Sequence, residues 1–285
     1  MKSENYESVY KKKNRFSFGK NWIQFLNSLN EDRVNQAKKS LVDFMGGVNR
    51  IRGKSFLDVG CGSGLFSLSA VLLGAKNVFS IDVDQYSIKC VNYLKKKYTK
   101  NAVNWKIKRG SVLNNDFLIQ LGKFDIVYSW GVLHHTGDMY EAISNVSNLV
   151  KEDGHLYLAI YNKVEKMFPE GSSEFWWTIK TIYNKSGKIT KRIMEAIYAS
   201  IIIFGLTINR INPIKYIGNY SSLRGMNFFT DIKDWLGGFP YEYATIKEIK
   251  TYVVNLGFTL IKTNRARSIG CNEFLFQKIS IKSKR

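Results

Sequence analysis

The sequence is poor in proline, cysteine and acidic residues, and it has no long hydrophobic run. Only 3 prolines and as much as 45% hydrophobic residues exclude a collagen-like or disordered chain and indicate a folded globular protein. The 3 cysteines are widely spaced, so we expect neither a disulfide framework nor a structural zinc site, and a reducing compartment is favoured. A length of 285 residues suits one large α/β domain with an insertion, or two small domains.

The longest apolar run, from Ala196 to Ile208, is shorter than the roughly 20 residues that cross a bilayer, and polar residues interrupt it. The first residues, MKSENYESVYKKKNRF, contain no apolar segment of the kind that a secretory signal has. We therefore expect a cytoplasmic protein, either free or peripheral at a membrane.

Acidic residues are few, since 23 Asp and Glu face 43 Lys and Arg, which gives a net charge of +20. A positive net charge suggests an anionic partner of one of three kinds: nucleic acid, an acidic small substrate, or an anionic membrane surface. The balance alone does not choose among them, because a lysine-rich surface is often only a solvated one.

Short β-branched runs alternate with helical stretches between residues 55 and 162, which predicts a parallel sheet covered by helices. The expected strands are residues 55–60, 77–82, 103–110, 124–130 and 154–162, with two more at 257–267 and 272–280. We predict an α/β protein with a doubly wound, seven-stranded, mostly parallel sheet and a helical insertion after the fifth strand. The expected regions are an N-terminal helical lid (1–50), a core (51–162), an insertion (163–240), and a closing helix with the last two strands (241–285).

The most informative stretch is Asp58-Val59-Gly60-Cys61-Gly62-Ser63-Gly64, which ends a predicted strand and begins a helix. Glycines there let the backbone turn tightly and let a ligand approach main-chain N–H groups at the positive end of a helix. Asp82 follows Gly64 by 18 residues and ends the second strand, where a carboxylate can accept both hydroxyls of a ribose. The arrangement predicts a site for a nucleotide-like cofactor.

The spacing of the glycines argues against a nicotinamide or flavin dehydrogenase, whose loop reads G-x-G-x-x-G. In the two available registers, the third glycine position falls on Leu65 or on Ser67. DVGCGSG with the later Asp82 instead resembles the first two motifs of class I S-adenosylmethionine-dependent methyltransferases. GSVLNNDF and FDIVYSWGVLHHTGD resemble the family's motifs after the third strand and at the fourth strand. Three further segments are similar to a bacterial subgroup often labelled quinone-type or generic methyltransferase: RFSFGKNWIQFL (15–26), RGMNFFTDIKDWLGGFPYE (224–242) and GCNEFLF (270–276).

The resemblance implies that the chain binds S-adenosylmethionine and its product S-adenosylhomocysteine. Asp58 and the loop glycines would hold the methionine part, Asp82 the ribose, and Ser111 with Val112 the adenine. The full set of cofactor positions that we expect is Asp58, Gly60, Cys61, Gly62, Gly64, Asp82, Val83, Ser111, Val112, Trp130, Phe18 and Trp22. Phe18 and Trp22 would form an N-terminal lid on the sulfonium side, since aromatic faces attract cations; plain packing of an N-terminal helix is the alternative.

Two adjacent histidines, His134 and His135, follow the fourth strand, where the family's acceptor site opens. An imidazole is suited to remove a proton from a hydroxyl near neutral pH, so we predict His135, or else His134, as the general base. A structural role in the loop is the alternative. No metal site is expected, because the spacing of Asp138 and Glu141 is more typical of the start of a helix than of a pair of metal ligands. Tyr161 and Asn162 are expected to contact the acceptor.

Within the insertion, Ile189, Ile193, Ile197 and Ile201 recur every four residues on one helical face that basic residues border. We expect this face to pack on the core, while some of the cations, Arg224 among them, meet an anionic part of the acceptor. Contact with an anionic membrane is the alternative.

The leading hypothesis is methyl transfer to a small-molecule or glycan acceptor, at a hydroxyl oxygen. Methylation of a membrane quinone or lipid is the second. An RNA-binding or RNA-modifying protein is the third, although the chain lacks recognisable RNA modules and the proline motifs of DNA base methylation, so nucleic acid is not the expected partner. A cofactor-binding protein without catalysis is the fourth. The sequence does not define the oligomeric state.

Overall fold

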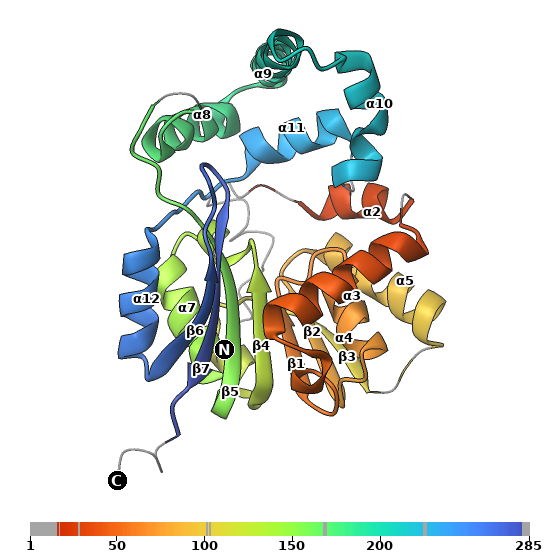
Figure 1. The fold of residues 1–285 in the computed structure, drawn as a ribbon, viewed down its shortest axis with the longest axis vertical. Helices are drawn as coiled ribbons and strands as arrows, with labels where there is room; N and C mark the ends of the chain where they lie inside the picture. Colours follow the sequence, from red (N-terminus) through yellow and green to blue (C-terminus); the bar gives the residue numbers. More distant parts are fainter. Residues whose placement is uncertain are drawn as a thin grey trace.

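The computed structural model describes residues 16, 18–27, 29–100, 102, 104–167, 170–224 and 227–280. Seven strands of the described chain form one sheet in the order β3-β2-β1-β4-β5-β7-β6. Their bounds are β1 Ser55–Val59, β2 Asn77–Asp82, β3 Trp105–Arg109, β4 Phe124–Trp130, β5 Val150–Tyr161, β6 Phe258–Asn264 and β7 Cys271–Lys278. The first five strands pair in parallel and β7 runs antiparallel to both of its neighbours, so the predicted doubly wound, mostly parallel sheet is confirmed (Figure 1).

Helices cover both faces of this sheet (Figure 1). One face carries α3 (Glu31–Met45), α4 (Leu65–Leu72) and α5 (Gln85–Thr99), whose buried residues include Leu41, Leu68 and Val91. The other face carries α6 (Asn115–Ile119), α7 (Met139–Asn148) and α12 (Ile246–Asn255). Short 3-10 turns at Val48–Arg50 (η1) and Leu133–His135 (η2) complete the elements of this part.

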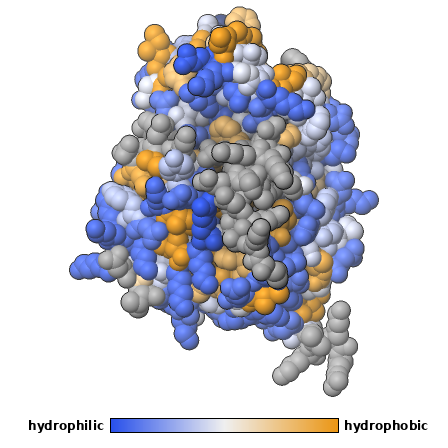
Figure 2. All heavy atoms as spheres, turned by 180° about the vertical axis from the view of Figure 1, so that it is seen from behind, coloured by the Kyte–Doolittle hydropathy of each residue, from blue (hydrophilic) through white to orange (hydrophobic). Residues whose placement is uncertain are grey.

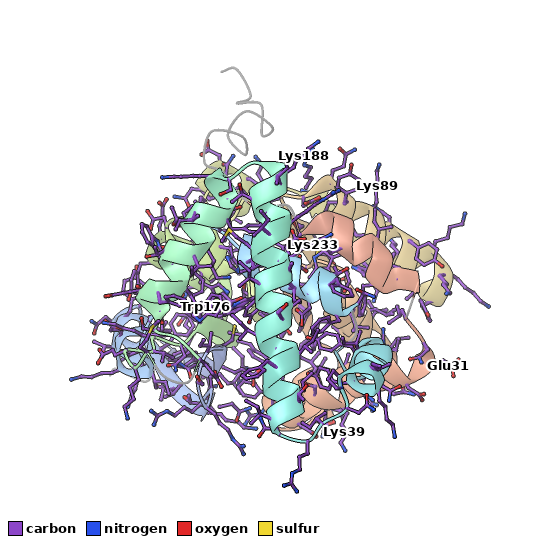
Figure 3. All side chains as sticks on the ribbon, turned by 90° about the horizontal axis from the view of Figure 1, so that it is seen from above. Glu31, Lys39, Lys89, Trp176, Lys188 and Lys233 are labelled. Carbon is purple, nitrogen blue, oxygen red and sulfur yellow. The ribbon has the colours of Figure 1, made fainter. Side chains whose placement is uncertain are left out.

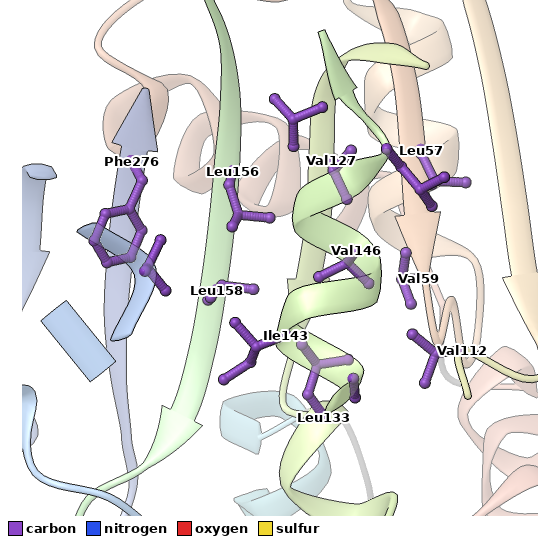
Figure 4. Close-up of a cluster of buried hydrophobic side chains, with 14 of the residues drawn as sticks. Leu57, Val59, Val112, Val127, Leu133, Ile143, Val146, Leu156, Leu158 and Phe276 are labelled. Carbon is purple, nitrogen blue, oxygen red and sulfur yellow. The ribbon is translucent and has the colours of Figure 1, made fainter. Parts of the chain in front are cut away.

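The core of the second face is built from β-branched and leucine side chains, which fit a sheet buried on both sides. Figure 4 shows Ile143 and Val146 of α7 packed against Val127 of β4 and Leu156 of β5, and all four side chains are fully buried. We call this two-faced unit, residues 29–162 and 241–280, the sheet domain.

Local signals explain where the helices begin and end. The Asn30 side chain accepts a hydrogen bond from the Arg33 N–H at the start of α3, and Gly46 ends that helix at a φ of 81°. Thr245 and Glu248 form a reciprocal capping box at the start of α12. These caps fix the helices that support the sheet.

Between β5 and α12, the described residues form four helices, which we call the cap. They are α8 (Ser173–Lys185), α9 (Lys188–Ile208), α10 (Pro213–Arg224) and α11 (Phe228–Gly237). Figure 1 shows the cap above the sheet, on the side where β4 ends, and Figure 3 shows α9 crossing the top of the molecule. The cap has a core of its own, which includes Trp176, Tyr183 and Phe228. None of the described helices combines the length and apolarity that a membrane crossing requires.

The N-terminal region differs from the expected lid. Residues 1–15 lie outside the described residues. Helix α3 packs on the sheet, where Phe44 stacks on Tyr157 of β5 at a ring distance of 4.3 Å, so it belongs to the sheet domain and not to a lid. Of the described N-terminal helices, α2 (Gly19–Asn27) is the one that lies between the sheet domain and the cap (Figure 1).

Candidate functional site

A cavity of about 1460 Å³ lies between the sheet domain, α2 and the cap. The ends of β1, β2, β4 and β5 contribute Val59, Asp82, Trp130 and Tyr161 to its lining. This is the edge of an α/β sheet where ligands usually bind, next to the point where the strand order reverses between β1 and β4.

The glycine loop after β1 is shaped by conformations that favour glycine. Gly60, Gly62 and Gly64 have φ angles of 71°, 51° and 83°, in the left-handed region. A Cβ at Gly60 would come within 2.3 Å of Val132 Cγ1, so this position also has no room for a side chain. Gly60 and Gly62 line the cavity with their backbone.

Asp82 joins this loop to the end of β2. Its Oδ2 accepts a hydrogen bond from Gly62 N at 3.0 Å, and its Oδ1 accepts one from Asp84 N at 2.8 Å. Desolvation raises the pKa of this carboxyl to about 6, although the two backbone N–H groups oppose the shift. The adjacent cavity wall contains Val83, Ser111 and Val112, three of the positions that the sequence indicated.

Asp58 does not line the cavity, which differs from the direct contact that the resemblance implied. Its buried carboxylate accepts a hydrogen bond from Ser67 Oγ at 2.5 Å, and Ser67 in turn bonds Ser80 Oγ at 2.6 Å. Trp105 Nε1 donates to the same Ser80 oxygen at 2.8 Å. Desolvation raises the pKa of Asp58 to about 7. Asp58 therefore supports the loop from beneath.

Cys61 and Gly64 also lie outside the lining. Cys61 is buried and joins the core of the α4 face, and desolvation raises the pKa of its thiol well above the usual value. A Cβ at Gly64 would meet Val91 Cγ2 of α5 at 2.8 Å, so this glycine allows the loop to approach α5 closely.

Helix α2 contacts both the glycine loop and the cap. A Cβ on Gly62 would lie 3.0 Å from the Trp22 indole, which places Trp22 directly against the loop. Gly19 N donates to Asp84 Oδ2 at 3.2 Å, while the Asn21 side-chain amide donates to Asp234 of α11. Phe18 and Trp22 both line the cavity, and Phe18 also contacts His135 in the loop after β4.

His135 lines the cavity, and its hydrogen bond defines its tautomer. Its Nδ1 lies 2.6 Å from the carbonyl oxygen of Pro240, which can only accept, so Nδ1 carries the proton and Nε2 has the lone pair. Burial lowers the pKa of His135 to about 3, so the ring is neutral at physiological pH. The Phe18 ring lies 5.2 Å from the imidazole.

His134 points into the wall and does not line the cavity. It is fully buried, and its Nδ1 accepts a hydrogen bond from Tyr161 N at 3.3 Å. Its Nε2 has no hydrogen-bond partner among the described residues, and burial lowers its pKa well below the usual value. Of the two histidines, the structure exposes only His135 to the cavity.

Tyr161 and Trp130 stand at the ends of neighbouring strands. The Tyr161 ring lies 3.9 Å from the His134 ring, and burial raises the pKa of its phenol well above the usual value. Trp130 is 46% exposed, and its indole N–H donates to Glu273 Oε1 at 2.7 Å. Asn162 lies outside the lining and bonds Ser268 O and Asn272 Nδ2 instead, so it supports the wall and does not face an acceptor.

The cap side of the cavity forms a chamber that is mostly apolar. Its side chains include Phe175, Trp176, Ile179, Met194, Tyr198, Ile232, Trp235 and Phe239. Its acidic residues are Asp231 and Asp234 of α11 and Glu170, which precedes α8. Within the described part of the chain, the lining contains no lysine or arginine, which argues against the expected cationic contacts with an anionic acceptor. The Arg224 side chain lies outside the described residues.

A buried lysine lies behind this chamber, and the sequence analysis did not identify it. The Lys180 ammonium donates to the Trp235 carbonyl and lies 4.1 Å from the Trp235 ring centre and 4.9 Å from that of Tyr241. Burial lowers the pKa of Lys180 to about 7, and burial raises the pKa of Asp234 to about 7. Lys180 stands in no recognisable motif, and the subgroup-like segment 224–242, which contains Asp234, assigns that residue no role. Only the three-dimensional packing brings the two together.

Residues 57–156 match a family model described as a methyltransferase domain. A ubiquinone biosynthesis O-methyltransferase of Glaesserella parasuis serovar 5 (strain SH0165) is 30% identical over 146 residues, which are 46% of this chain and 61% of the relative. A ribosomal protein L11 methyltransferase of Thermotoga petrophila is 30% identical over 128 residues, 45% of each chain. The chain thus spans less than two thirds of the length of either relative.

Two solved structures share the fold at low sequence identity. A magnesium protoporphyrin IX methyltransferase from Synechocystis PCC 6803 with bound S-adenosylhomocysteine has a TM-score of 0.51 and 17% identity, covering 85% of this chain and 82% of that one. An O-methyltransferase family protein from Burkholderia thailandensis has a TM-score of 0.54 and 11% identity, covering 85% of this chain and 56% of that one.

Proposed function

Because residues 57–156 form a methyltransferase domain of the class I S-adenosylmethionine-dependent type, we propose that the chain transfers a methyl group from that cofactor to a small, largely apolar acceptor. The observation that carries the proposal is one continuous cavity. It joins the glycine loop and Asp82 on one side to an aromatic chamber on the other.

The residues at the sheet edge fit the cofactor. The backbone of Gly60 and Gly62 lines the cavity without a side chain and would hold the methionine part, and the Asp82 carboxylate would accept the ribose hydroxyls. Val83, Ser111 and Val112 would hold the adenine, and Phe18 and Trp22 would cover the sulfonium side. When bound, the cofactor supplies a methyl carbon that already carries its leaving group.

His135 is the group that would move a proton. Its Nδ1–H is bonded to the Pro240 carbonyl, which leaves the Nε2 lone pair available to an acceptor hydroxyl in the cavity. Because the pKa of His135 is about 3, the neutral ring would take the proton only as methyl transfer makes the acceptor oxygen strongly acidic. The chamber walls would exclude water and orient the acceptor. His134 would act only by fixing the wall behind it.

The chamber favours an acceptor that is apolar and that donates hydrogen bonds. Aromatic and branched side chains make up most of the cap side, and the polar groups Asp231 and Asp234 can accept from a hydroxyl or an amine. A quinone-like or phenolic hydroxyl suits this lining better than a glycan, which would need many polar partners. The relative from Glaesserella parasuis is named for an O-methylation in ubiquinone biosynthesis, which supports the same class.

The decisive experiment has two steps. Calorimetry with S-adenosylhomocysteine should give saturable binding to one site, and the Asp82→Ala variant should weaken it. The protein, incubated with methyl-labelled S-adenosylmethionine and fractionated extract, should then label an organic-soluble fraction. Absence of any cofactor binding would overturn the proposal, and label in the RNA fraction with salt-sensitive binding would favour the RNA alternative.

A further inference from the structure

The apolar face of α9 is exposed, contrary to the expectation that it packs on the sheet domain. The exposed fractions are 78% at Ile189, 67% at Phe204 and 64% at Ile208, and Ile193 is also exposed. Ile211 and Ile214 extend this apolar surface into the start of α10. Figure 2 shows hydrophobic side chains along the top of the molecule, where α9 and α10 lie in Figure 1. We call this surface the α9 ridge.

The exposure does not arise from a detached helix, because the opposite side of α9 is held by the cap. Ala199 is buried in the cap core, and Met194, Tyr198 and Ile202 pack around it. The Tyr198 ring lies 5.3 Å from the Trp176 ring of α8. Helix α9 therefore has one face for the cap and presents a second apolar face to the outside.

Basic side chains flank the α9 ridge. Lys188, Arg192, Arg210 and Lys215 are all exposed. The one acidic residue of α9, Glu195, accepts a hydrogen bond from Tyr183 Oη at 2.6 Å and is only partly exposed. An amphipathic helix with bulky apolar side chains and a basic border is the usual form of an element that lies in a membrane interface.

The cavity reaches this same helix. Ile197 and Ile201 line the cavity and yet are 56% and 61% exposed, so they stand at its mouth. The path from the α9 ridge to the aromatic chamber is thus lined by apolar side chains from its start.

We propose that the α9 ridge docks on an anionic membrane surface, with the mouth of the cavity turned toward the lipid. Charge complementarity selects this occupant: the chain carries a net charge of +20, and a second copy would bring the same cations against the ridge. An apolar acceptor dissolved in the bilayer would then enter past Ile197 and Ile201. Docking stands by itself, whereas this delivery of the acceptor rests on the proposed function.

The test uses the full chain and sedimentation with vesicles of phosphatidylcholine alone or mixed with phosphatidylglycerol. We expect binding to the mixed vesicles that weakens as salt rises. The double variant Ile189→Ser with Phe204→Ser should lower the association constant for the mixed vesicles by about tenfold or more, because it removes two apolar side chains that would be buried in the bilayer. Ile119→Ser is the matched control, since Ile119 is 76% exposed on α6 in the sheet domain and should not affect binding.

The charge contribution has its own matched pair. Lys188→Gln with Lys215→Gln should weaken binding by about thirtyfold, from about 1 kcal/mol per lysine at the surface. Lys54→Gln with Lys76→Gln removes the same charge just before β1 and β2, at the end of the sheet away from the cavity, and should have no effect. The ridge variants should keep cofactor affinity, which checks their fold.

Three outcomes would overturn the docking proposal. The first is no binding to mixed vesicles at low salt, and the second is equal binding to phosphatidylcholine alone. The third is a concentration-dependent dimer, seen by analytical ultracentrifugation, that the ridge variants abolish, because this would make a second copy the occupant. Cofactor binding is measured separately, so its failure would remove the proposed function and leave the docking result intact.

Discussion

Helix α7 in the sheet domain and helix α9 in the cap both carry apolar side chains along one face, but only α7 has that face covered. Met139, Ile143 and Val146 of α7 are buried against β4 and β5, whereas Ile189 and Phe204 of α9 are mostly exposed. The same periodicity thus has opposite outcomes. A helical pattern defines an apolar face, and only the neighbouring elements decide what covers it.

The two regions also differ in where their charges lie. The sheet domain buries the Asp58 carboxylate beneath the glycine loop, inside a network of hydroxyl groups. The cap places Lys188 and Lys215 at the surface beside exposed isoleucines. The charged group of the sheet domain is therefore buried in its core, while the outer side of the cap exposes both cations and apolar side chains, as an interaction surface does.

The largest effect should come from the residue where the two regions meet. His135→Ala removes the Nε2 lone pair from the cavity, so turnover should fall by about 10² to 10⁴. Steady-state rates with a labelled acceptor and calorimetry with S-adenosylhomocysteine check this, since cofactor affinity should stay nearly unchanged. His155→Ala on β5 is the control and should keep its activity. A variant with wild-type turnover would assign His135 to loop structure alone.

The contrast between α7 and α9 can be measured by making the same substitution, isoleucine to alanine, once on each helix. Ile143→Ala leaves a cavity in a packed core and should lower the free energy of unfolding by about 2 to 5 kcal/mol. Ile189→Ala removes an exposed side chain and should change it by less than about 0.5 kcal/mol. Urea unfolding of both variants decides the matter. Equal losses would mean that α9 is covered in solution.

The buried carboxylate predicts a pH dependence of stability. The pKa of Asp58 rises from 3.8 to about 7 on folding, so the folded state binds more protons between these values and stability falls as pH rises through them. Asp58→Asn cannot titrate. Its free energy of unfolding should therefore gain about 2 to 4 kcal/mol relative to the wild type between pH 4 and pH 7.5.

Urea unfolding at the two pH values measures this difference. Asp116→Asn, on the surface of α6, serves as the control and should follow the wild type. A constant difference between Asp58→Asn and the wild type at both pH values would show that Asp58 keeps its charge in the folded state.

The smallest predicted loss of function tests the cofactor side of the cavity. Asp82→Ala removes the acceptor for Gly62 N and, in the proposed function, for the ribose hydroxyls, and each lost charge-assisted bond is worth about 1.5 to 3 kcal/mol. Cofactor affinity should drop by roughly tenfold or more in calorimetry. Asp32→Ala, exposed in the first turn of α3, should bind normally. Unchanged affinity in Asp82→Ala would remove the ribose assignment.

Much of the sheet domain could be predicted because its signals are local. Short β-branched runs predicted the strands. The glycines of the loop predicted a tight turn after β1, and the φ angles of this turn, 51° to 83°, are ones that favour glycine. The family resemblance rested on these same residues, and both the fold and the resemblance are confirmed. Asp82 could be placed near the loop because parallel strands end at one edge.

The cap could not be predicted in the same way, because its properties depend on contacts between distant residues. Lys180 reads as a surface lysine in the sequence, yet Trp235 and Tyr241 enclose its ammonium group. The isoleucines of α9 read as a core face because nothing local distinguishes a covered face from an open one. The burial of Asp58 likewise depends on Ser67 and Ser80, which lie outside the recognised motif.

Helix α2 has a consequence for the timing of the proposed reaction. Trp22 lies against Gly62, and Asn21 ties the helix to Asp234 of α11. In the proposed function the spent cofactor would lie beneath α2 and would leave as α2 separates from the loop, a movement that would also break the hydrogen bond to α11. Departure of one product would then loosen the chamber that held the other, and the opening rate of α2 would set an upper limit on turnover.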